Sequence, residues 1–240
     1  MAGHSKWANI KHRKGAQDQK RGKIFTKLIK EITIASRLAG GDLDSNPRLR
    51  KAVSNAKSNN MPSDNIERAI KKGIGDLDGV AYDEITYEGY GPNGVAIILE
   101  VITDNKNRSV AEVRHAFSKF GCSLSESGSV SWMFEKKGLI ILEDNSIDYD
   151  TLFETALMAG AEDLEKFEDK YIVTTSFESL MEIRKAIEND GYIIKSADYE
   201  MISKTTQKVP KSESDSVLKL LESLDNNYDV NRLFSNLELE

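Results

Sequence analysis

The sequence contains few of the residues that mark secreted, membrane or metal-binding proteins. Its 240 residues include one cysteine, Cys122, and three histidines, at positions 4, 12 and 115. A lone cysteine cannot form an internal disulfide, and these histidines lack the spacing of metal ligands. No apolar run approaches the roughly 18 residues that cross a bilayer, and the basic start of the chain has no apolar signal-peptide core. We therefore expect a cytoplasmic protein without a metal site or a membrane partner.

Patterns typical of catalysis and cofactor binding are also scarce. The segment Gly89-Tyr90-Gly91-Pro92-Asn93-Gly94 has the spacing of a dinucleotide fingerprint, but the strand-like run Val95–Ile102 follows it where that fingerprint requires a helix. A tight turn between two strands explains it better. The serine-rich segment Ser123–Trp132 lacks a G-x-S-x-G elbow. We predict no enzymatic activity, no cofactor and no small-molecule substrate.

Positive charge is in the minority overall but is concentrated at one end of the chain. The formal net charge is −6. Residues 1–75 hold 17 Lys and Arg against 6 Asp and Glu, a net of +11, whereas the other 165 residues hold 16 against 33, a net of −17. Asymmetry of this size indicates an end of the chain that binds a polyanion.

The basic end divides into an arm and a helix. Residues 1–19 show no usable apolar period, so we expect a mobile or partly helical arm. From Lys20 onward, apolar residues between Phe25 and Ala35 recur at helical spacing, and the helix should end at Gly40-Gly41. At 100° per residue, its lysines gather on the opposite side. We expect the apolar side to pack and the basic side to face solvent.

These basic side chains are the candidate nucleic-acid contacts. Lys and Arg give sequence-independent affinity for phosphate, and stacking of a base on Trp7 adds about 1–3 kcal/mol. The alternative is a solvated charged tail. The predicted contact residues are His4, Lys6, Trp7, Lys11, His12, Arg13, Lys14, Lys20, Arg21, Lys23, Lys27 and Lys30.

A second basic segment lies between a predicted strand and a predicted helix, after Asp104. It offers a second contact patch formed by Lys106, Arg108, Arg114 and His115. The same segment can equally be a polar loop in which Ser109 caps the helix. Both alternatives stay open at this point.

The order of elements indicates a helical part followed by α/β parts. Asn46-Pro47 opens a second helix, and Asp64 with Glu67 resembles a capping box that opens a third, ending at Gly73. Three strand–helix repeats with a terminal glycine follow, at Val95–Gly121, Leu139–Gly160 and Tyr171–Gly191. They are typical of split βαβ, ferredoxin-like sheets. A strand near Ile193–Ile202, a helix around Val217–Leu224 and a last short helix at Val230–Leu237 complete the prediction.

Several segments resemble the YebC family, which includes the mitochondrial translational activator of cytochrome c oxidase. The resemblance covers essentially the whole chain, although Gly15 and Asn93 depart from the family pattern. The matching segments are Met1-Ala2-Gly3-His4-Ser5-Lys6-Trp7-Ala8-Asn9-Ile10-Lys11-His12-Arg13-Lys14, Lys20-Arg21-Gly22-Lys23-Ile24-Phe25-Thr26-Lys27-Leu28, Asn46-Pro47-Arg48-Leu49-Arg50, Asn60-Met61-Pro62, Asp64-Asn65-Ile66-Glu67-Arg68-Ala69-Ile70, Tyr87-Glu88-Gly89-Tyr90-Gly91-Pro92, Val110-Ala111-Glu112-Val113-Arg114-His115-Ala116-Phe117 and Gly128-Ser129-Val130.

The resemblance implies an α+β fold of three domains without catalytic activity. A small N-terminal helical domain, residues 1–80, would precede two ferredoxin-like α/β domains. The first would comprise residues 81–135 and 203–240, and the second, residues 136–202, would be inserted into it.

The resemblance also narrows the choice of nucleic acid. Members of the family are widely labelled DNA-binding transcriptional regulators, whereas the mitochondrial relatives indicate the ribosome, including synthesis through proline runs. Lys23, Lys27 and Lys30 offer phosphate contacts and little base readout, and Trp7 suits unpaired bases, which RNA offers more often. We expect a ribosome-associated factor that binds ribosomal RNA or tRNA, with DNA binding and transcription regulation as the alternative.

Overall fold

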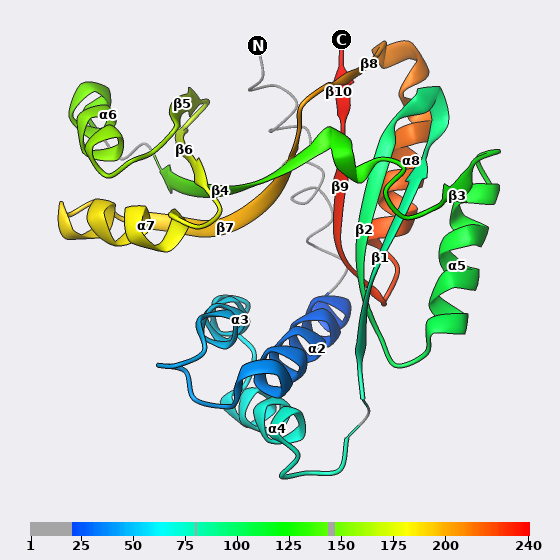
Figure 1. The fold of residues 1–240 in the computed structure, drawn as a ribbon, viewed down its shortest axis with the longest axis horizontal. Helices are drawn as coiled ribbons and strands as arrows, with labels where there is room; N and C mark the ends of the chain where they lie inside the picture. The colour runs from blue at the N-terminus through cyan, green and yellow to red at the C-terminus, as the bar shows by residue number, and fades with distance from the viewer. Residues whose placement is uncertain (1–20, 80, 144–146) are drawn as a thin grey trace. The chain divides into compact units, whose positions relative to one another are not determined.

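The computed structural model describes residues 21–79, 81–143 and 147–240. These residues form two compact units, one made of residues 21–131 with 207–240 and the other of residues 132–206 (Figure 1). Each unit is described by itself below. The chain is a mixed α/β protein in which a helical N-terminal part precedes the sheets.

The larger unit begins with three helices, as the sequence predicts. They are α2 (Arg21–Ala39), α3 (Pro47–Ser58) and α4 (Ser63–Ile74). Their shared core contains Ile32, Leu49 and Ala56. The predicted cap of α3 is confirmed, because the side chain of Asn46 accepts a hydrogen bond from the backbone N–H of Leu49, with Pro47 at the first helical position.

The boundaries of α4 differ from the prediction at both ends. The capping box of Asp64 and Glu67 is wrong, because the helix already begins at Ser63, which places Asp64 inside its first turn, and no side chain caps it. The helix ends at Gly75, whose φ of +89° suits a left-handed cap, rather than at Gly73. A Cβ atom on Gly73 would lie 2.5 Å from the carbonyl oxygen of Thr33 and 2.6 Å from Cβ of Ser36. At Gly73, α4 therefore approaches α2 too closely for a side chain to fit without a shift.

The same unit contains a four-stranded antiparallel sheet. Its strands are β1 (Asp83–Tyr90), β2 (Ala96–Thr103), β3 (Ser123–Ser125) and β9 (Val230–Ser235), in the order β3-β1-β2-β9. The helices α5 (Lys106–Ser118) and α8 (Asp215–Asp225) pack together over it (Figure 1). A 3₁₀ turn, η2 (Pro92–Gly94), joins β1 to β2, which confirms the turn predicted for Pro92-Asn93-Gly94.

The C-terminal prediction is wrong in one element. Val230–Leu237 is not a helix but the strand β9, followed by β10 (Leu237–Leu239), which pairs in parallel with β8 (Gln207–Val209). A 3₁₀ turn, η4 (Lys211–Glu213), precedes α8. The apolar residues of 230–237 have a spacing compatible with a helix, but β2 has an edge that β9 fills, and such pairing overrides local preference.

The buried carboxylate of Glu88 holds the loop around residues 128–131 in place. Both oxygens of Glu88 on β1 accept backbone hydrogen bonds, from Gly128 at 2.8 Å, Val130 at 2.8 Å and Ser131 at 2.9 Å. The serine-rich segment is thus an ordered loop held by β1, in agreement with its interpretation as a loop or strand edge.

The smaller unit is a second four-stranded antiparallel sheet. After η3 (Ser131–Met133), the strands β4 (Phe134–Glu143), β5 (Asp163–Phe167), β6 (Lys170–Ser176) and β7 (Ile194–Ser203) lie in the order β5-β6-β4-β7. The helices α6 (Tyr149–Met158) and α7 (Leu180–Asn189) share a core with this sheet through Leu152, Tyr171 and Ile183. This is the strand order of a split βαβ unit, as the strand–helix repeats predict.

Candidate nucleic-acid interface

Most of the predicted contacts on the basic arm lie outside the described residues. This holds for His4, Lys6, Trp7, Lys11, His12, Arg13, Lys14 and Lys20, and for the side chain of Arg21. Their role in nucleic-acid binding stays a prediction. The lysines of α2 and the second patch, in contrast, have defined surroundings.

The first two lysines of α2 lie against the C-terminal end of α8. Nζ of Lys23 donates to the carbonyl oxygen of Asn226 at 3.3 Å, and Nζ of Lys27 donates to that of Asp225 at 2.8 Å. Lys27 also lies 3.6 Å from the Asp225 carboxylate, and Lys23 lies 5.1 Å from the centroid of the Tyr228 ring. Carbonyls at the end of a helix carry partial negative charge, so cations stabilise α8 there.

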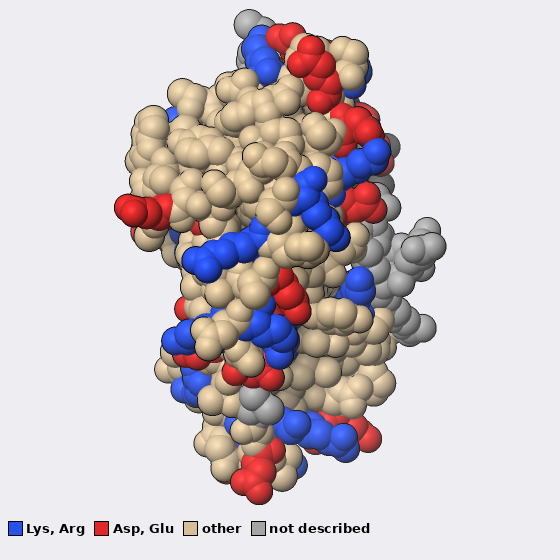
Figure 2. Space-filling view, turned by 90° about the vertical axis from the view of Figure 1, so that its right-hand side faces the viewer, with Lys and Arg blue, Asp and Glu red and all other residues tan. Residues whose placement is uncertain are grey.

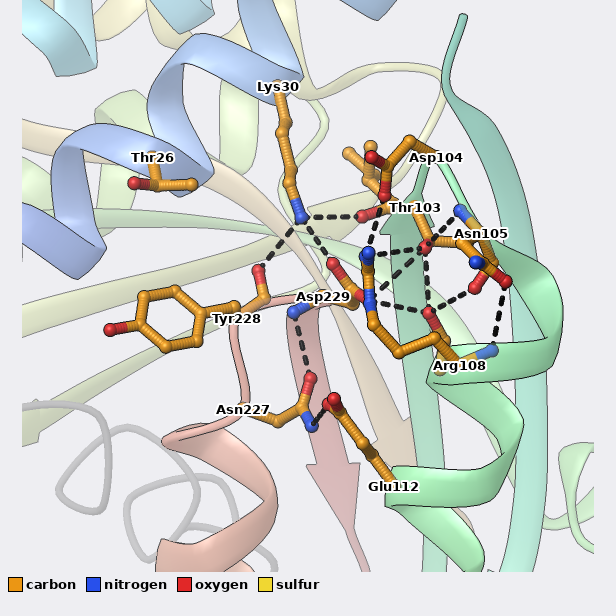
Figure 3. Close-up of polar contacts among 12 residues, drawn as sticks. Thr26, Lys30, Thr103, Asp104, Asn105, Arg108, Glu112, Asn227, Tyr228 and Asp229 are labelled. Carbon is orange, nitrogen blue, oxygen red and sulfur yellow. Dashed lines mark hydrogen bonds and ion pairs between the residues drawn. The ribbon is translucent and has the colours of Figure 1, made fainter. Parts of the chain in front are cut away.

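The third lysine is buried and fully engaged. Nζ of Lys30 lies 2.5 Å from the carboxylate of Asp229 and donates to the carbonyl oxygens of Ile102 and Tyr228, both at 3.1 Å (Figure 3). Only 6% of Lys30 is exposed. The expectation that the basic side of this helix faces solvent is therefore wrong: Lys23 and Lys27 are half-buried, Lys30 is buried, and all three hold α2 against the segment between α8 and β9.

Asp229 is the acidic centre of this cluster. Besides Lys30, its carboxylate accepts hydrogen bonds from Ser109 at 2.6 Å, Arg108 at 2.8 Å and Thr103 at 3.1 Å (Figure 3). Burial by itself raises the pKa of Asp229, but the hydrogen bonds from Lys30, Ser109 and Arg108 outweigh it and lower the pKa to about 2. The group is thus a buried carboxylate that stays ionised because cations and hydroxyls surround it.

The predicted second patch is divided by these contacts. Arg108 lies 2.6 Å from Asp104 and 2.8 Å from Asp229, and this pairing raises the pKa of its guanidinium. Lys106 forms an ion pair with Asp83 at 3.5 Å. Arg114 and His115 lie exposed further along α5. Hence Arg108 is committed to the cluster, whereas Arg114 and His115 remain available for a ligand.

The sequence-based prediction of the α5 cap is wrong, and the role of Asp229 could not be predicted from the sequence. Ser109 does not cap α5, because the helix begins at Lys106 and Asn105 accepts the capping hydrogen bond from the N–H of Arg108 at 3.0 Å. Asp229 gave no signal, because the acid that completes the cluster lies 199 residues from Lys30 in the chain. Asn227 adds to the same loop by donating to Glu112 of α5 at 2.8 Å (Figure 3).

The surface around α5 carries charges of both signs. In Figure 2, which views the side of the molecule where α5 lies, Lys and Arg side chains are interspersed with Asp and Glu side chains. A mixed surface of this kind produces no strong field of one sign.

The described residues contain neither a candidate membrane-spanning helix nor a candidate metal site. No helix in the described ranges is long and apolar enough to cross a membrane. No group of three or more His, Cys, Asp or Glu side chains in those ranges is arranged to hold a metal ion.

Comparison with known proteins gives matches along almost the entire chain. The family model described as "TACO1/YebC protein N-terminal domain" matches residues 5–76, and that described as "TACO1/YebC second and third domain" matches residues 82–237. A probable transcriptional regulatory protein of Syntrophotalea carbinolica is 55% identical over 239 residues, and one of Geotalea uraniireducens is 53% identical over 239 residues. Each alignment covers 100% of this chain and 96% of the relative.

A solved structure agrees with the sequence matches. The crystal structure of a conserved hypothetical protein from Aquifex aeolicus is similar with a TM-score of 0.87 and 43% sequence identity. The alignment covers 98% of this chain and 97% of that chain.

Proposed function

Because the chain belongs to the TACO1/YebC family, we propose that it is a non-enzymatic regulator of gene expression that binds nucleic acid through its N-terminal end. The names of the relatives support the regulatory part of this proposal, since both are called probable transcriptional regulatory proteins. We further propose that it divides into the three domains expected from the sequence, at residues 1–80, 81–135 with 203–240, and 136–202.

The main support for nucleic-acid binding is the unequal distribution of charge along the chain. Residues 1–75 have a net charge of +11 and the remainder a net charge of −17. An acidic remainder repels phosphate and so restricts a polyanion to the basic end. Of the α2 lysines, Lys30 is occupied by Asp229, so the arm before Lys23 must supply most of the contacts.

The ligand that we propose is RNA on the ribosome, bound by a translation factor that helps synthesis through proline-rich stretches. Recognition of a DNA sequence usually needs a helix that presents a row of donors to base edges. On α2 the row that has this spacing, Lys23, Lys27 and Lys30, donates to the segment 225–229 and to Ile102 instead. An arm that contains Trp7 suits the stacking of unpaired bases.

Transcription regulation through DNA is the second candidate. The names of the relatives favour it directly. Phosphate contacts from the arm would serve a DNA duplex as well as RNA, so the two candidates differ in base exposure rather than in charge.

Equilibrium binding of the full-length protein tests the site. Anisotropy of a labelled 20-nucleotide RNA and of a DNA duplex with the same sequence would be measured from 50 to 300 mM KCl. The triple variant Lys6→Ala, Arg13→Ala, Lys14→Ala should bind RNA at least tenfold more weakly at low salt, and its slope of log affinity against log salt should be smaller by about 2. The matched variant Lys185→Ala, Lys204→Ala, Lys211→Ala removes three exposed cations outside the basic end and should bind like the wild type.

The choice between RNA and DNA and the role in the cell are tested by separate results. Tighter binding to the duplex than to RNA would favour the transcription candidate, and equal loss in both triple variants would contradict the arm as the contact surface. Ribosome profiling of a deletion strain should show new pauses at proline runs, and the protein should sediment with ribosomes. If new pauses and co-sedimentation are both absent, the translation role is excluded, whereas the proposal of nucleic-acid binding is unaffected.

A further inference from the structure

The helix α6 of the smaller unit has more apolar side chains than its own core uses. Leu152 and Ala156 face the core and are almost completely buried. Tyr149, Phe153 and Leu157 recur at every fourth position, so they form one row along the helix, which we call the α6 stripe. Exposure rises along it from 39% for Tyr149 and 40% for Phe153 to 57% for Leu157.

The α6 stripe is ordered by contacts within its own unit. The rings of Tyr149 and Phe153 are stacked, with centroids 6.0 Å apart, and the Tyr149 ring lies 6.1 Å from that of Tyr171 in the core. The hydroxyl of Tyr149 donates to the carbonyl oxygen of Leu164 on β5 at 3.2 Å. Tyr149 and Phe153, held in this way, lose little side-chain entropy when a partner covers them. Single exposed apolar residues are common in proteins, whereas three in a row on one helix are typical of an interaction site.

Acidic side chains border this row. At 100° per residue, Asp150 and Glu154 project beside Leu157, and both are exposed. The segment 132–206 as a whole holds 8 Lys and Arg against 17 Asp and Glu, a net charge of −9. A surface of this charge repels nucleic acid and attracts cations.

From these observations we propose that the α6 stripe is a docking surface for a basic amphipathic helix of a partner protein. The apolar side of that helix would cover Phe153 and Leu157, and its Lys or Arg side chains would reach Asp150 and Glu154. This arrangement follows the way in which amphipathic helices bind apolar surfaces through side chains at positions i, i+4 and i+7. The proposal is independent of the nucleic-acid binding proposed for the other end of the chain.

A designed peptide tests the proposal on the full-length protein. The probe is a fluorescent 18-residue helix with leucine along one side and lysine on the other, and its competitors are a peptide of the same composition in scrambled order and one with glutamate in place of lysine. The amphipathic basic peptide should bind best. The variant Phe153→Ser, Leu157→Ser should weaken its binding at least about tenfold, because buried apolar anchors dominate such contacts.

Two further variants separate the contribution of the apolar row from those of other exposed apolar residues and of charge. Met158→Ser changes a residue of the same helix that is 89% exposed but lies outside the stripe, and it should bind the peptide like the wild type. Asp150→Asn, Glu154→Gln keeps the apolar row and should lower affinity mainly at low salt. Thermal unfolding of each variant checks that the fold is retained.

Other results would overturn the proposal. Equal binding of the scrambled peptide, or unchanged binding by the Phe153→Ser, Leu157→Ser variant, would mean attraction by general charge alone. A wild-type protein that self-associates, and that Leu157→Ser converts to monomers without any peptide binding, would make a second copy of the chain the occupant. Binding of a synthetic peptide of residues 1–20 to the stripe, in preference to the designed peptide, would identify the chain's own arm as the occupant.

Discussion

At the scale of single residues, the cluster around Asp229 decides how the helical part is attached to the sheet. Lys30 comes from α2, Thr103 from the end of β2, and Arg108 and Ser109 from α5, and all of them donate to one carboxylate. Buried ion pairs often add little net stability, but removing one partner leaves a buried charge uncompensated. Replacing both members of an ion pair in the cluster should therefore cost less free energy of unfolding than the sum of the two single replacements.

Substitution of Asp229 should reveal this coupling. Asp229→Asn leaves the Lys30 ammonium buried without a counter-charge, so we expect a loss of about 3–5 kcal/mol in the free energy of unfolding. Lys30→Met should cost less, because Asp229 keeps Arg108. The double variant should then cost less than the sum of the two single ones, as measured by urea denaturation followed by circular dichroism. Lys71→Met, at an exposed position of α4, is the control and should change stability by less than about 0.5 kcal/mol. Strictly additive losses would show that Lys30 and Asp229 do not depend on each other.

The same carboxylate makes stability depend on pH. The pKa of Asp229 is lowered from the ordinary value of 3.8 to about 2 in the folded protein. Because its pKa is lowered, ionised Asp229 stabilises the folded protein fully above about pH 4, and this stabilisation is lost as the pH falls toward 2. The difference corresponds to roughly 2.5 kcal/mol. The gap in unfolding free energy between the wild type and Asp229→Asn should shrink by about this amount from pH 6 to pH 2, and a constant gap would contradict the assignment. Comparison with the variant is needed because other carboxyls, such as Glu88, also have lowered pKa values.

At the scale of elements, the approach of α4 to α2 depends on one missing side chain. Gly73 lies within α4, where glycine ordinarily weakens a helix by about 1 kcal/mol relative to alanine. It is required here because a Cβ atom would lie 2.5 Å from the carbonyl oxygen of Thr33. Helix preference and helix packing therefore oppose each other at this residue.

The substitution Gly73→Ala measures which of the two effects is larger. We expect a net destabilisation of about 1–3 kcal/mol, because the neighbouring atom is backbone and cannot move aside easily. Gly22→Ala is a matched control in α2, since nothing lies within 4 Å of its Cβ position, and it should be neutral or stabilising by up to about 1 kcal/mol. Thermal unfolding of both variants checks the prediction, and a stabilised Gly73→Ala protein would show that the helices can separate without cost.

Elements with a local signature could be predicted from the sequence. The glycine pair 40–41 marks the end of α2, Asn46-Pro47 marks the start of α3, and Pro92-Asn93-Gly94 marks the turn between β1 and β2. Features that depend on distant partners could not. The spacing within Val230–Leu237 predicts a helix, because its strand partner β2 lies about 130 residues earlier and leaves no local signal. Nothing local indicates that Glu88 binds a loop 40 residues later.

The candidate site shows the same limit. Periodicity correctly placed Lys23, Lys27 and Lys30 on one side of α2, but it could not tell that this side faces Asp225 and Asp229. A charged row opposite an apolar row is usually exposed because burial of a charge is costly. Here the carbonyl oxygens of the segment 225–229 and the carboxylates of Asp225 and Asp229 offset that cost, and their position is set by the tertiary fold.

At the scale of the whole molecule, charge is distributed in a way that separates two kinds of contact. The basic end is suited to phosphate, and the acidic segment 132–206 is suited to cationic protein surfaces. A chain built in this way could bring a nucleic acid and a basic protein to the same molecule. The variants of the arm and those of the α6 stripe test these two properties independently, because they change different parts of the chain.

The contact between Lys30 and Asp229 also has a consequence for the order of events during synthesis. Helices α2, α3 and α4 can form early, because their core joins residues that are close in the chain. The residues that hold α2 in place, 225–229, and the strand β9 that completes the first sheet are among the last to be made. A nascent chain interrupted shortly before residue 225 would thus carry a formed basic helical bundle without its attachment. The final tenth of the polypeptide therefore determines when α2 becomes fixed.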